Sequence, residues 1–181
     1  HKGGAKFDYE KAKWFNAEWI KKMDNEKLAP LVVPFLNEAG IIIHDQDYLV
    51  SVINLVKERC VLLTDFVTQS AFFFKTPDNI DTASILPKWD SNKAAFFTEL
   101  VAKYQDALQQ GASTIPAETL ESDFKELVTQ HNLKAGELML PFRIMLVGGK
   151  FGPGVFDIVN LIGLADAMTR ISHCLELLST K

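Results

Sequence analysis

The chain has few cysteines and no long apolar run, which argues against cysteine-based metal or redox sites and against a membrane-spanning helix. It contains two cysteines in 181 residues, and Cys60 and Cys174 lie too far apart for the paired spacing of a zinc knuckle or a thiol redox motif. We therefore predict two buried thiols. No apolar stretch approaches the roughly 20 residues that a membrane-spanning helix needs, and no secretory signal pattern opens the chain. We expect a cytoplasmic protein with no membrane partner, and, because the chain begins at His1 and not at Met, part of a longer gene product.

The chain also lacks an excess of positive charge. The 19 Lys and Arg face 23 Asp and Glu, which gives a net charge of -4 and a pI of about 5.6. This balance excludes a surface that binds nucleic acid over its whole area, so any RNA contact must be local and we expect no DNA partner. The basic residues are scattered and, taken alone, are typical of solvated helix faces; they include Lys11, Lys13, Lys21, Lys22, Lys57, Arg59, Arg143 and Lys150.

Recognisable catalytic patterns are absent as well. The sequence has no Gly-x-Ser-x-Gly elbow and no Cys/His nucleophile pair. His44, Asp45 and Asp47 offer metal-ligating atoms, but they precede an apolar-periodic run, where Asp is favoured as a helix cap and first-turn acid. We therefore expect no catalytic residue and no metal site in this chain.

What the sequence does have is apolar residues at spacings of three and four, the period of an amphipathic helix. This period, with Asp8 as a predicted N-cap and Gly40 as a predicted helix stop, indicates an all-α chain. The segment 134–147 is ambiguous because its second half has strand propensity, but Pro141 argues against a central strand and we predict a helix there. One expected helix opens within 113–118 and runs to about 131. The other expected helices span 8–22, 25–39, 45–58, 62–74 (one or two short helices), 91–110, 134–147, 155–162 and 165–178.

A cluster of turn formers, Thr76-Pro77-Asp78-Asn79, separates two apolar-periodic blocks. We place a boundary there and expect a helix bundle made of two consecutive helical subdomains, residues 1–76 and 77–181. No internal repeat at the periods of solenoid proteins relates the two blocks.

The most informative local feature is the glycine-rich segment from Gly148 to Gly154. It combines backbone freedom, a cation at Lys150 and a following helix whose first N–H groups could face an anion. It is not a nucleotide-binding P-loop, because Phe151 and not Ser or Thr follows the lysine. Two interpretations stay open: a cradle for phosphate or RNA backbone, and an ordinary loop between helices. Aromatic rings could also stack on unpaired bases, although core packing is expected for most of the candidates, which are Phe72, Phe73, Phe74, Phe96 and Phe97.

The motifs of the C-terminal part are recognisable. The run from Gly136 to Gly148, followed by Gly152-Pro153-Gly154-Val155-Phe156-Asp157-Ile158, resembles the anticodon-binding region of bacterial glutamyl-tRNA synthetases. In that family a Pro-Leu-Arg element leads to a Thr-Gly turn and then to Pro-Gly-Leu-Phe-Glu. The resemblance spans nearly the whole chain, with further matches at Leu161-Ile162-Gly163, Arg170-Ile171, Ala5-Lys6-Phe7-Asp8 and Lys13-Trp14-Phe15-Asn16.

The resemblance implies two helical subdomains that grip the anticodon loop of tRNA-Glu. It implies two arginines that contact anticodon bases and a loop that packs against them, and a planar guanidinium suits this role because it can pair with a base edge or stack on its face. Val147 stands where the family usually has Thr, and Gly152 where some members have Thr, which leaves the base preference open. The implied anticodon-binding residues are Arg59, Arg143, Lys150, Gly152, Pro153 and Val155.

The same resemblance implies that the chemistry lies outside this chain. The adenylation signatures His-x-Gly-His and Lys-Met-Ser-Lys are absent, so ATP and Mg are expected in a catalytic domain that this chain does not contain, and no cofactor is expected here. The chain would contact that domain and a stem-contact domain intramolecularly. The alternative is a helical protein-interaction module without RNA binding, which the acidic pI favours. A third interpretation, a phosphate-binding enzyme built on the glycine-rich loop, lacks any base or nucleophile beside that loop.

Overall fold

The computed structural model describes residues 8–180. Throughout this range the chain forms α-helices and short 3-10 helices and no strand, so the all-α prediction is confirmed. Among these residues no helix combines the length and the apolar character that crossing a membrane requires. The elements are α1 (Tyr9–Lys22), α2 (Asn25–Glu38), α3 (Gln46–Val56), η1 (Lys57–Arg59), α4 (Asp65–Phe74), α5 (Thr82–Ile85), η2 (Leu86–Lys88), α6 (Ser91–Gln109), α7 (Ala117–Gln130), α8 (Ala135–Val147), α9 (Val155–Ile162) and α10 (Leu164–Ser179).

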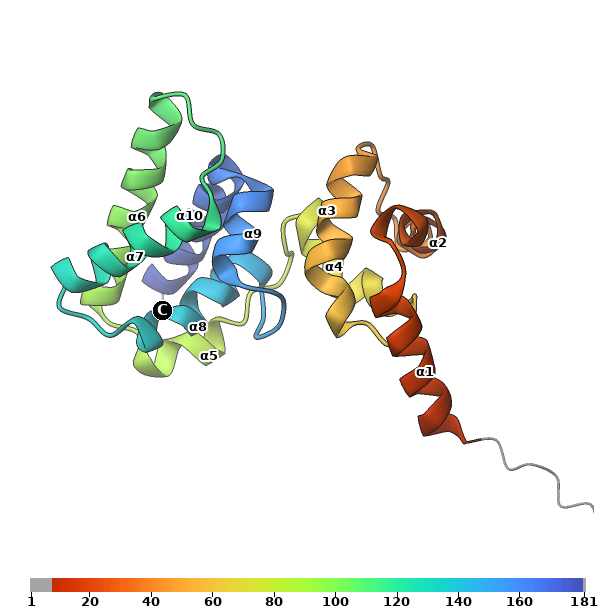
Figure 1. Ribbon diagram of the computed structural model, residues 1–181. Coiled ribbons are helices and arrows are strands. Elements are labelled where there is room, and N and C mark those ends of the chain that lie inside the picture. The colour runs from red at the N-terminus through yellow and green to blue at the C-terminus, as the bar shows by residue number, and fades with distance from the viewer. Residues whose placement is uncertain (1–7, 181) are drawn as a thin grey trace, which may run out of the picture. The chain divides into compact units, whose positions relative to one another are not determined.

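The helices belong to two compact units. The first unit spans His1–Phe74 and the second Lys75–Lys181. Figure 1 shows α1 to α4 of the first unit in red to yellow, and α5 to α10 of the second unit in yellow-green to blue.

The core of the first unit lies among α2, α3 and α4, which contact one another pairwise. The buried apolar residues recur every three or four positions, because that spacing puts side chains on one helix face. Asp45 begins α3 as the predicted cap, since its carboxylate accepts a hydrogen bond from the backbone N–H of Tyr48 at 3.0 Å. Gly40 takes a φ of +77° just after α2, as expected of a helix stop. The fully buried core residues include Leu28, Val32, Leu36, Leu49, Val52, Ile53, Val56 and Phe66.

Helix α1 projects from this core with most of its length uncovered (Figure 1). Asp8 caps it as predicted, and its carboxylate accepts from the backbone N–H of Lys11 at 3.0 Å. Ile20 is the residue of α1 that is buried. The side chain of Asn16 donates a hydrogen bond to the carbonyl of Val61, which fixes the helix against the turn before α4.

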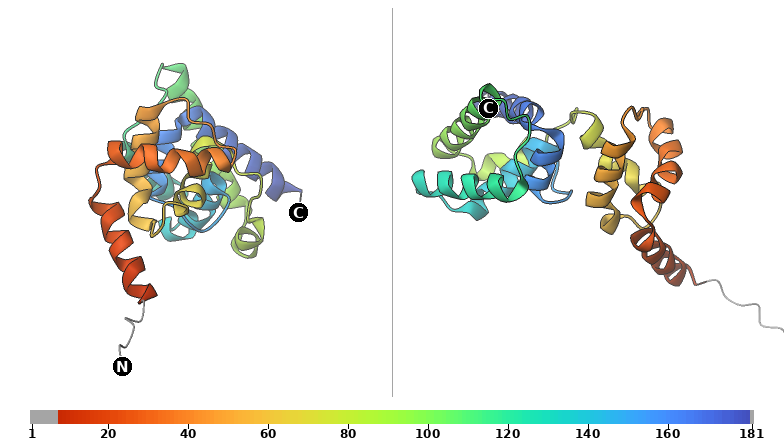
Figure 2. Two further views of the ribbon diagram at one scale, coloured as in Figure 1. Left: turned by 90° about the vertical axis from the view of Figure 1, so that its right-hand side faces the viewer. Right: turned by 45° about the horizontal axis from the view of Figure 1, so that its top comes forward.

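In the second unit, α6 and α10 make the most extensive helix–helix contact, and α9 contacts α7, α8 and α10. The right-hand view of Figure 2 shows green α6 beside blue α10. A phenylalanine cluster joins four of these helices, with ring centroids 5.0 Å apart for Phe96 and Phe124, 5.3 Å for Phe124 and Phe142, and 6.0 Å for Phe142 and Phe156. Offset and edge-to-face ring pairs of this kind add to the energy of burial.

Two differences from the sequence predictions are local. The short elements α5 and η2 were not predicted, since four helical residues followed by Pro87 are too few to show a period. Helix α4 begins at Asp65 and not at Leu62. The reason is the carboxylate of Asp65, which accepts from the backbone N–H groups of Val61 and Leu62 at 2.8 and 2.9 Å and so stabilises a turn before the helix.

Candidate nucleic-acid interface

The glycine-rich loop begins where α8 must end. Gly148 has a φ of +84°, a left-handed conformation that L side chains rarely adopt. A Cβ at this position would lie 2.5 Å from the carbonyl oxygen of Asn79 and 2.9 Å from Cβ of Pro77. The carbonyl of Gly148 in turn accepts from the backbone N–H of Asp81 at 2.9 Å. The start of the loop is therefore fixed against the segment before α5.

Arg143 folds the loop back onto α8. Its Nη1 donates to the carbonyl oxygens of Phe151 at 3.1 Å, Gly152 at 2.9 Å and Pro153 at 2.6 Å. One cation thus holds three consecutive carbonyls, and hydrogen bonds from a charged donor are the stronger kind. Gly152 has a φ of +100°, which allows the chain to reverse there. These hydrogen bonds bring three of the predicted site residues, Arg143, Gly152 and Pro153, into one cluster, in which Pro153 is buried.

Val155 and Lys150 flank this cluster in different ways. Val155 is 4% exposed in the first turn of α9, so its side chain packs inward. Lys150 is exposed. It acts on Asp81, whose pKa is lowered mainly by the hydroxyl hydrogen bond from Ser84 and further by the charge of Lys150. The loop therefore carries a solvent-exposed cation at Lys150, and the buried side chain of Val155 follows it in the first turn of α9.

Arg59 belongs to the first unit, whereas the other five predicted site residues belong to the second. It ends the short helix η1 and is exposed. The neighbouring cation of η1, Lys57, is used structurally, because its Nζ donates to the carbonyl of Met23 at 3.2 Å. Of these two basic side chains, Arg59 is the one directed to solvent.

The sequence did not predict that Arg170 forms a buried ion pair and links α10 to α8. This side chain is 2% exposed and pairs bidentately with Asp166, with Nε–Oδ1 at 2.9 Å and Nη2–Oδ2 at 2.7 Å. Its Nη1 donates to the carbonyl of Leu146 at 2.7 Å. The last turn of α8, from which the loop departs, is thereby tied to α10. The Asp-x-x-x-Arg spacing was the available signal, since it places both groups on one helix face.

The aromatic candidates from the sequence are core residues. Phe72, Phe73, Phe96 and Phe97 are buried, and Phe74 is half-buried. The rings that reach solvent lie elsewhere, on α1 and at Phe151, which is 42% exposed. A phenylalanine within a Lys- and Gly-containing loop was the signal for the latter.

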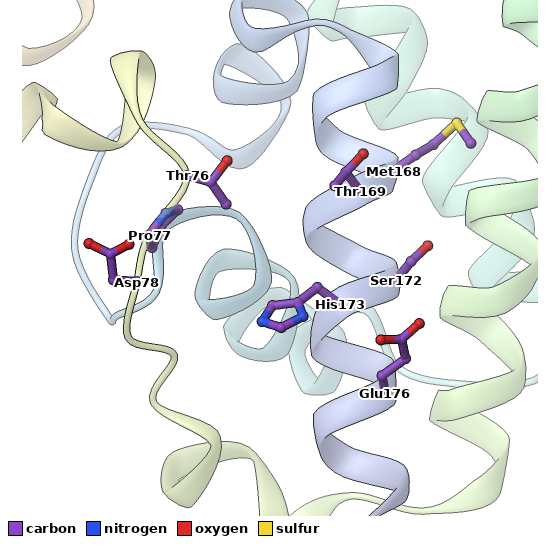
Figure 3. Close-up of a pocket in the computed structure, with 8 residues that line it drawn as sticks. All are labelled: Thr76, Pro77, Asp78, Met168, Thr169, Ser172, His173 and Glu176. Carbon is purple, nitrogen blue, oxygen red and sulfur yellow. The ribbon is translucent and has the colours of Figure 1, made fainter.

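A cavity of about 690 Å³ lies elsewhere in the second unit, between the segment before α5 and helix α10. Figure 3 shows the segment that carries Thr76, Pro77 and Asp78 opposite helix α10. Asp78 and Glu176 contribute two carboxylates to its lining, which contains no Lys or Arg. This lining offers no cation to a phosphate or an RNA strand, whereas the glycine-rich loop carries Lys150, so the loop is the better candidate interface.

Comparison with known proteins decides the family. Residues 27–175 match the family described as anticodon binding domain, and this range contains all six predicted site residues. The chain belongs to the anticodon-binding domain family.

Similar proteins confirm the predicted family resemblance. A glutamate–tRNA ligase of Porphyromonas gingivalis is 34% identical over 177 residues, which cover 98% of this chain and 34% of that protein. One of Flavobacterium psychrophilum is 33% identical over 178 residues with the same coverage of 98% and 34%. A crystal structure of a glutamate tRNA ligase from Elizabethkingia meningosepticum superposes with a TM-score of 0.82 at 31% identity, covering 98% of this chain and 34% of that one. The chain thus spans about one third of the length of these relatives.

Proposed function

We propose that this chain binds the anticodon loop of tRNA-Glu as the tRNA-reading part of a cytoplasmic glutamate–tRNA ligase. The observation that carries the proposal is the loop from Gly148 to Gly154, held by Arg143 inside the segment that matches the anticodon-binding family. Activation of glutamate with ATP and Mg would belong to the part of the ligase outside this chain, and so would its transfer to the tRNA.

The two arginines serve the proposed function differently. Arg59 is exposed, so its guanidinium can pair with a base edge or stack on a base. One nitrogen of Arg143 donates hydrogen bonds to three loop carbonyls, so Arg143 also sets the shape of the surface that would contact the RNA. Lys150 adds a charge for the phosphate backbone, whereas Pro153 and Val155 are buried and act by placing the loop.

A binding titration tests this proposal. We would measure the affinity of the 181-residue chain for a tRNA-Glu anticodon arm and for an arm of the same length with exchanged loop bases. Replacing Arg59 or Arg143 by Ala should weaken binding to the cognate arm about tenfold or more, since one good base contact is worth roughly 1–3 kcal/mol. The matched control is Lys125→Ala, which removes an exposed cation from α7 and should leave binding unchanged.

The salt dependence gives a second readout. With Lys150 as the phosphate-neutralising charge, log affinity should fall with log salt with a slope of about -0.7, the value for one contact on single-stranded RNA. Equal affinity for both arms, untouched by salt and by both arginine substitutions, would overturn the proposal in favour of a protein-interaction module.

We further propose that α1 carries the surface that docks on the rest of the ligase. Its exposed rings are Tyr9 (60%), Trp14 (59%), Phe15 (56%) and Trp19 (45%), and Phe15 and Trp19 line a groove of about 830 Å³ with Leu63. Exposed apolar patches of this kind mark interaction sites. About two thirds of the length of the relatives lies outside this chain, which supplies a protein partner for the patch.

Quenching of tryptophan fluorescence by acrylamide tests the docking surface. Trp14 and Trp19 should be strongly quenched in the 181-residue chain and protected in the full-length ligase, with a Trp14→Phe, Trp19→Phe double variant providing the signal of the half-buried Trp89. Equal quenching of the two α1 rings in both proteins would show that this face stays in water.

A further inference from the structure

Asp81 lies beside the start of the glycine-rich loop and begins helix α5. Its carboxylate accepts hydrogen bonds from the backbone N–H of Ser84 at 3.2 Å and from the hydroxyl of Ser84 at 2.6 Å, so it is the N-cap of that helix. Its own backbone N–H donates to the carbonyl oxygen of Gly148 at 2.9 Å. One residue therefore caps α5 and holds the first residue of the loop.

Packing on two sides fixes the position of this aspartate. Helix α5 contacts α8 and α10, and Ile85 at its end is 2% exposed. On the loop side, a Cβ added at Gly148 would lie 2.5 Å from the carbonyl oxygen of Asn79 and 2.9 Å from Cβ of Pro77. The carboxylate of Asp81 is thus held at one place relative to the loop before any ligand arrives.

Lys150 is the exposed cation of the loop, and its charge reaches this carboxylate. The pKa of Asp81 is lowered mainly by the hydroxyl hydrogen bond from Ser84 and further by the charge of Lys150. The other acid beside the loop is Asp157, next to Gly154, but it lies in the first turn of α9, where the helix dipole offsets a negative charge. An RNA phosphate that approaches Lys150 therefore also meets the negative charge of Asp81.

We propose that Asp81 sets the affinity of the RNA site, because its fixed carboxylate weakens the contact between Lys150 and a phosphate of the RNA. The inference rests on the proposed function and adds a positioning residue to the site, which acts on RNA through Lys150. In water, one unit charge a few Å away changes such a contact by about fivefold at most. Phosphates are the same in every RNA, so this effect lowers binding to all sequences and leaves the choice between them to the base contacts.

Replacing Asp81 by Asn tests the charge without removing the cap, because Asn is an equally good N-cap. We would measure binding of the 181-residue chain and of Asp81→Asn to the tRNA-Glu anticodon arm and to the arm with exchanged loop bases. Asp81→Asn should bind both arms about two- to fivefold more tightly at low salt, and the ratio of the two affinities should stay the same. The gain should shrink at about 0.3 M salt, where screening is stronger.

A second uncharged cap and a double variant locate the effect. Asp81→Ser should give the same gain as Asp81→Asn, since serine also caps a helix. In a Lys150→Gln background the gain from Asp81→Asn should largely disappear, because both changes act on one phosphate contact.

The matched control is Asp45→Asn. Asp45 is exposed and caps α3, with its carboxylate accepting from the backbone N–H of Tyr48 at 3.0 Å. The substitution removes the same charge and keeps the same kind of cap, but in the first unit. It should leave binding to both arms unchanged.

Several results would overturn the inference. Asp81 has no such role if Asp81→Asn and Asp81→Ser bind both arms as the wild type does, or if Asp45→Asn gives the same gain. A gain that persists in full without Lys150, or that is confined to the cognate arm, also contradicts it. A wild-type chain that binds both arms equally would instead refute the proposed function, while the gain from Asp81→Asn would still be measurable on both arms.

Discussion

Replacing Arg170 by Met tests whether one buried arginine secures the end of α8. The methionine has a similar length but no donors, so the carbonyl of Leu146 loses its partner at 2.7 Å and Asp166 loses its bidentate pair. An unsatisfied buried carbonyl costs about 1–3 kcal/mol, and breaking a buried ion pair costs about 3–5 kcal/mol. The second figure must be reduced because the side chain of Asp166 is 35% exposed and can be rehydrated.

We therefore expect a loss of about 3 kcal/mol, measured by urea unfolding of the 181-residue chain. A domain near 100 residues loses about 4–8 °C of Tm per kcal/mol, so the unfolding of the second unit should move down by about 12–24 °C. The Asp166→Asn, Arg170→Met double variant should lose less than the sum of the two single changes, because they share one interaction.

A matched control isolates burial as the cause. Lys125 and Glu121 form a pair on α7 with the same four-residue spacing at 2.6 Å, but their side chains are 63% and 47% exposed. Lys125→Met should change stability by no more than about 0.5 kcal/mol, as exposed pairs contribute little. Similar losses for Arg170→Met and Lys125→Met, or a loss below about 1 kcal/mol for Arg170→Met, would refute the reasoning.

Two further predictions concern the backbone and the thiols. Gly148→Ala should lower the free energy of unfolding by about 2 kcal/mol or more, because of the strain of a left-handed residue and overlap with the carbonyl of Asn79. Gly136 has open space around it, so Gly136→Ala should be neutral or stabilise the chain by up to about 1 kcal/mol. Equal chemical-denaturation midpoints for the two variants would contradict this prediction. Burial raises the pKa of Cys60 from 9.0 to about 12 and that of Cys174 from 9.0 to about 11, so the unfolded chain deprotonates first and stability present below pH 9 is lost as the pH rises toward these values. A Cys60→Ala variant should lose less stability between pH 8 and 10.5 than the wild type, and an equal loss would argue against the thiol as the cause.

The helices could be predicted because their causes are local in the sequence. The period of apolar residues and the caps at Asp8 and Asp45 define α1 and α3 within a few residues. Helix α8 was predicted against strand propensity in its second half, and its burial on several sides explains the ambiguity, since a helix covered all round shows no clear apolar face. Helix α5 has too few residues to carry any period.

The internal contacts of the candidate site could not be read from the sequence. Sequence spacing does not show that Arg143 reaches the carbonyls of Phe151, Gly152 and Pro153, because this contact depends on the chain reversal after α8. The exposure of Phe151 has the same origin. A phenylalanine in a loop can fold inward or outward, and here the ring lies so close to Gly149 that a Cβ added there would be 3.0 Å from its Cε1.

The acidic charge of the chain is compatible with RNA reading because many of its cations are already paired, so that a few unpaired ones can form a local site. Many lysines lie three or four residues from an acid on the same helix or turn, and phosphate contacts by such residues would carry no sequence information. Among the residues that the structure describes, no carboxylate lies within ion-pair distance of Arg59 or Lys150. With a net negative charge, phosphate contacts should contribute little to binding, so the contacts to bases should decide which tRNA stays bound, while the rest of the ligase would raise the effective concentration. The paired lysines include Lys13, Lys21, Lys22, Lys27, Lys75, Lys93 and Lys125.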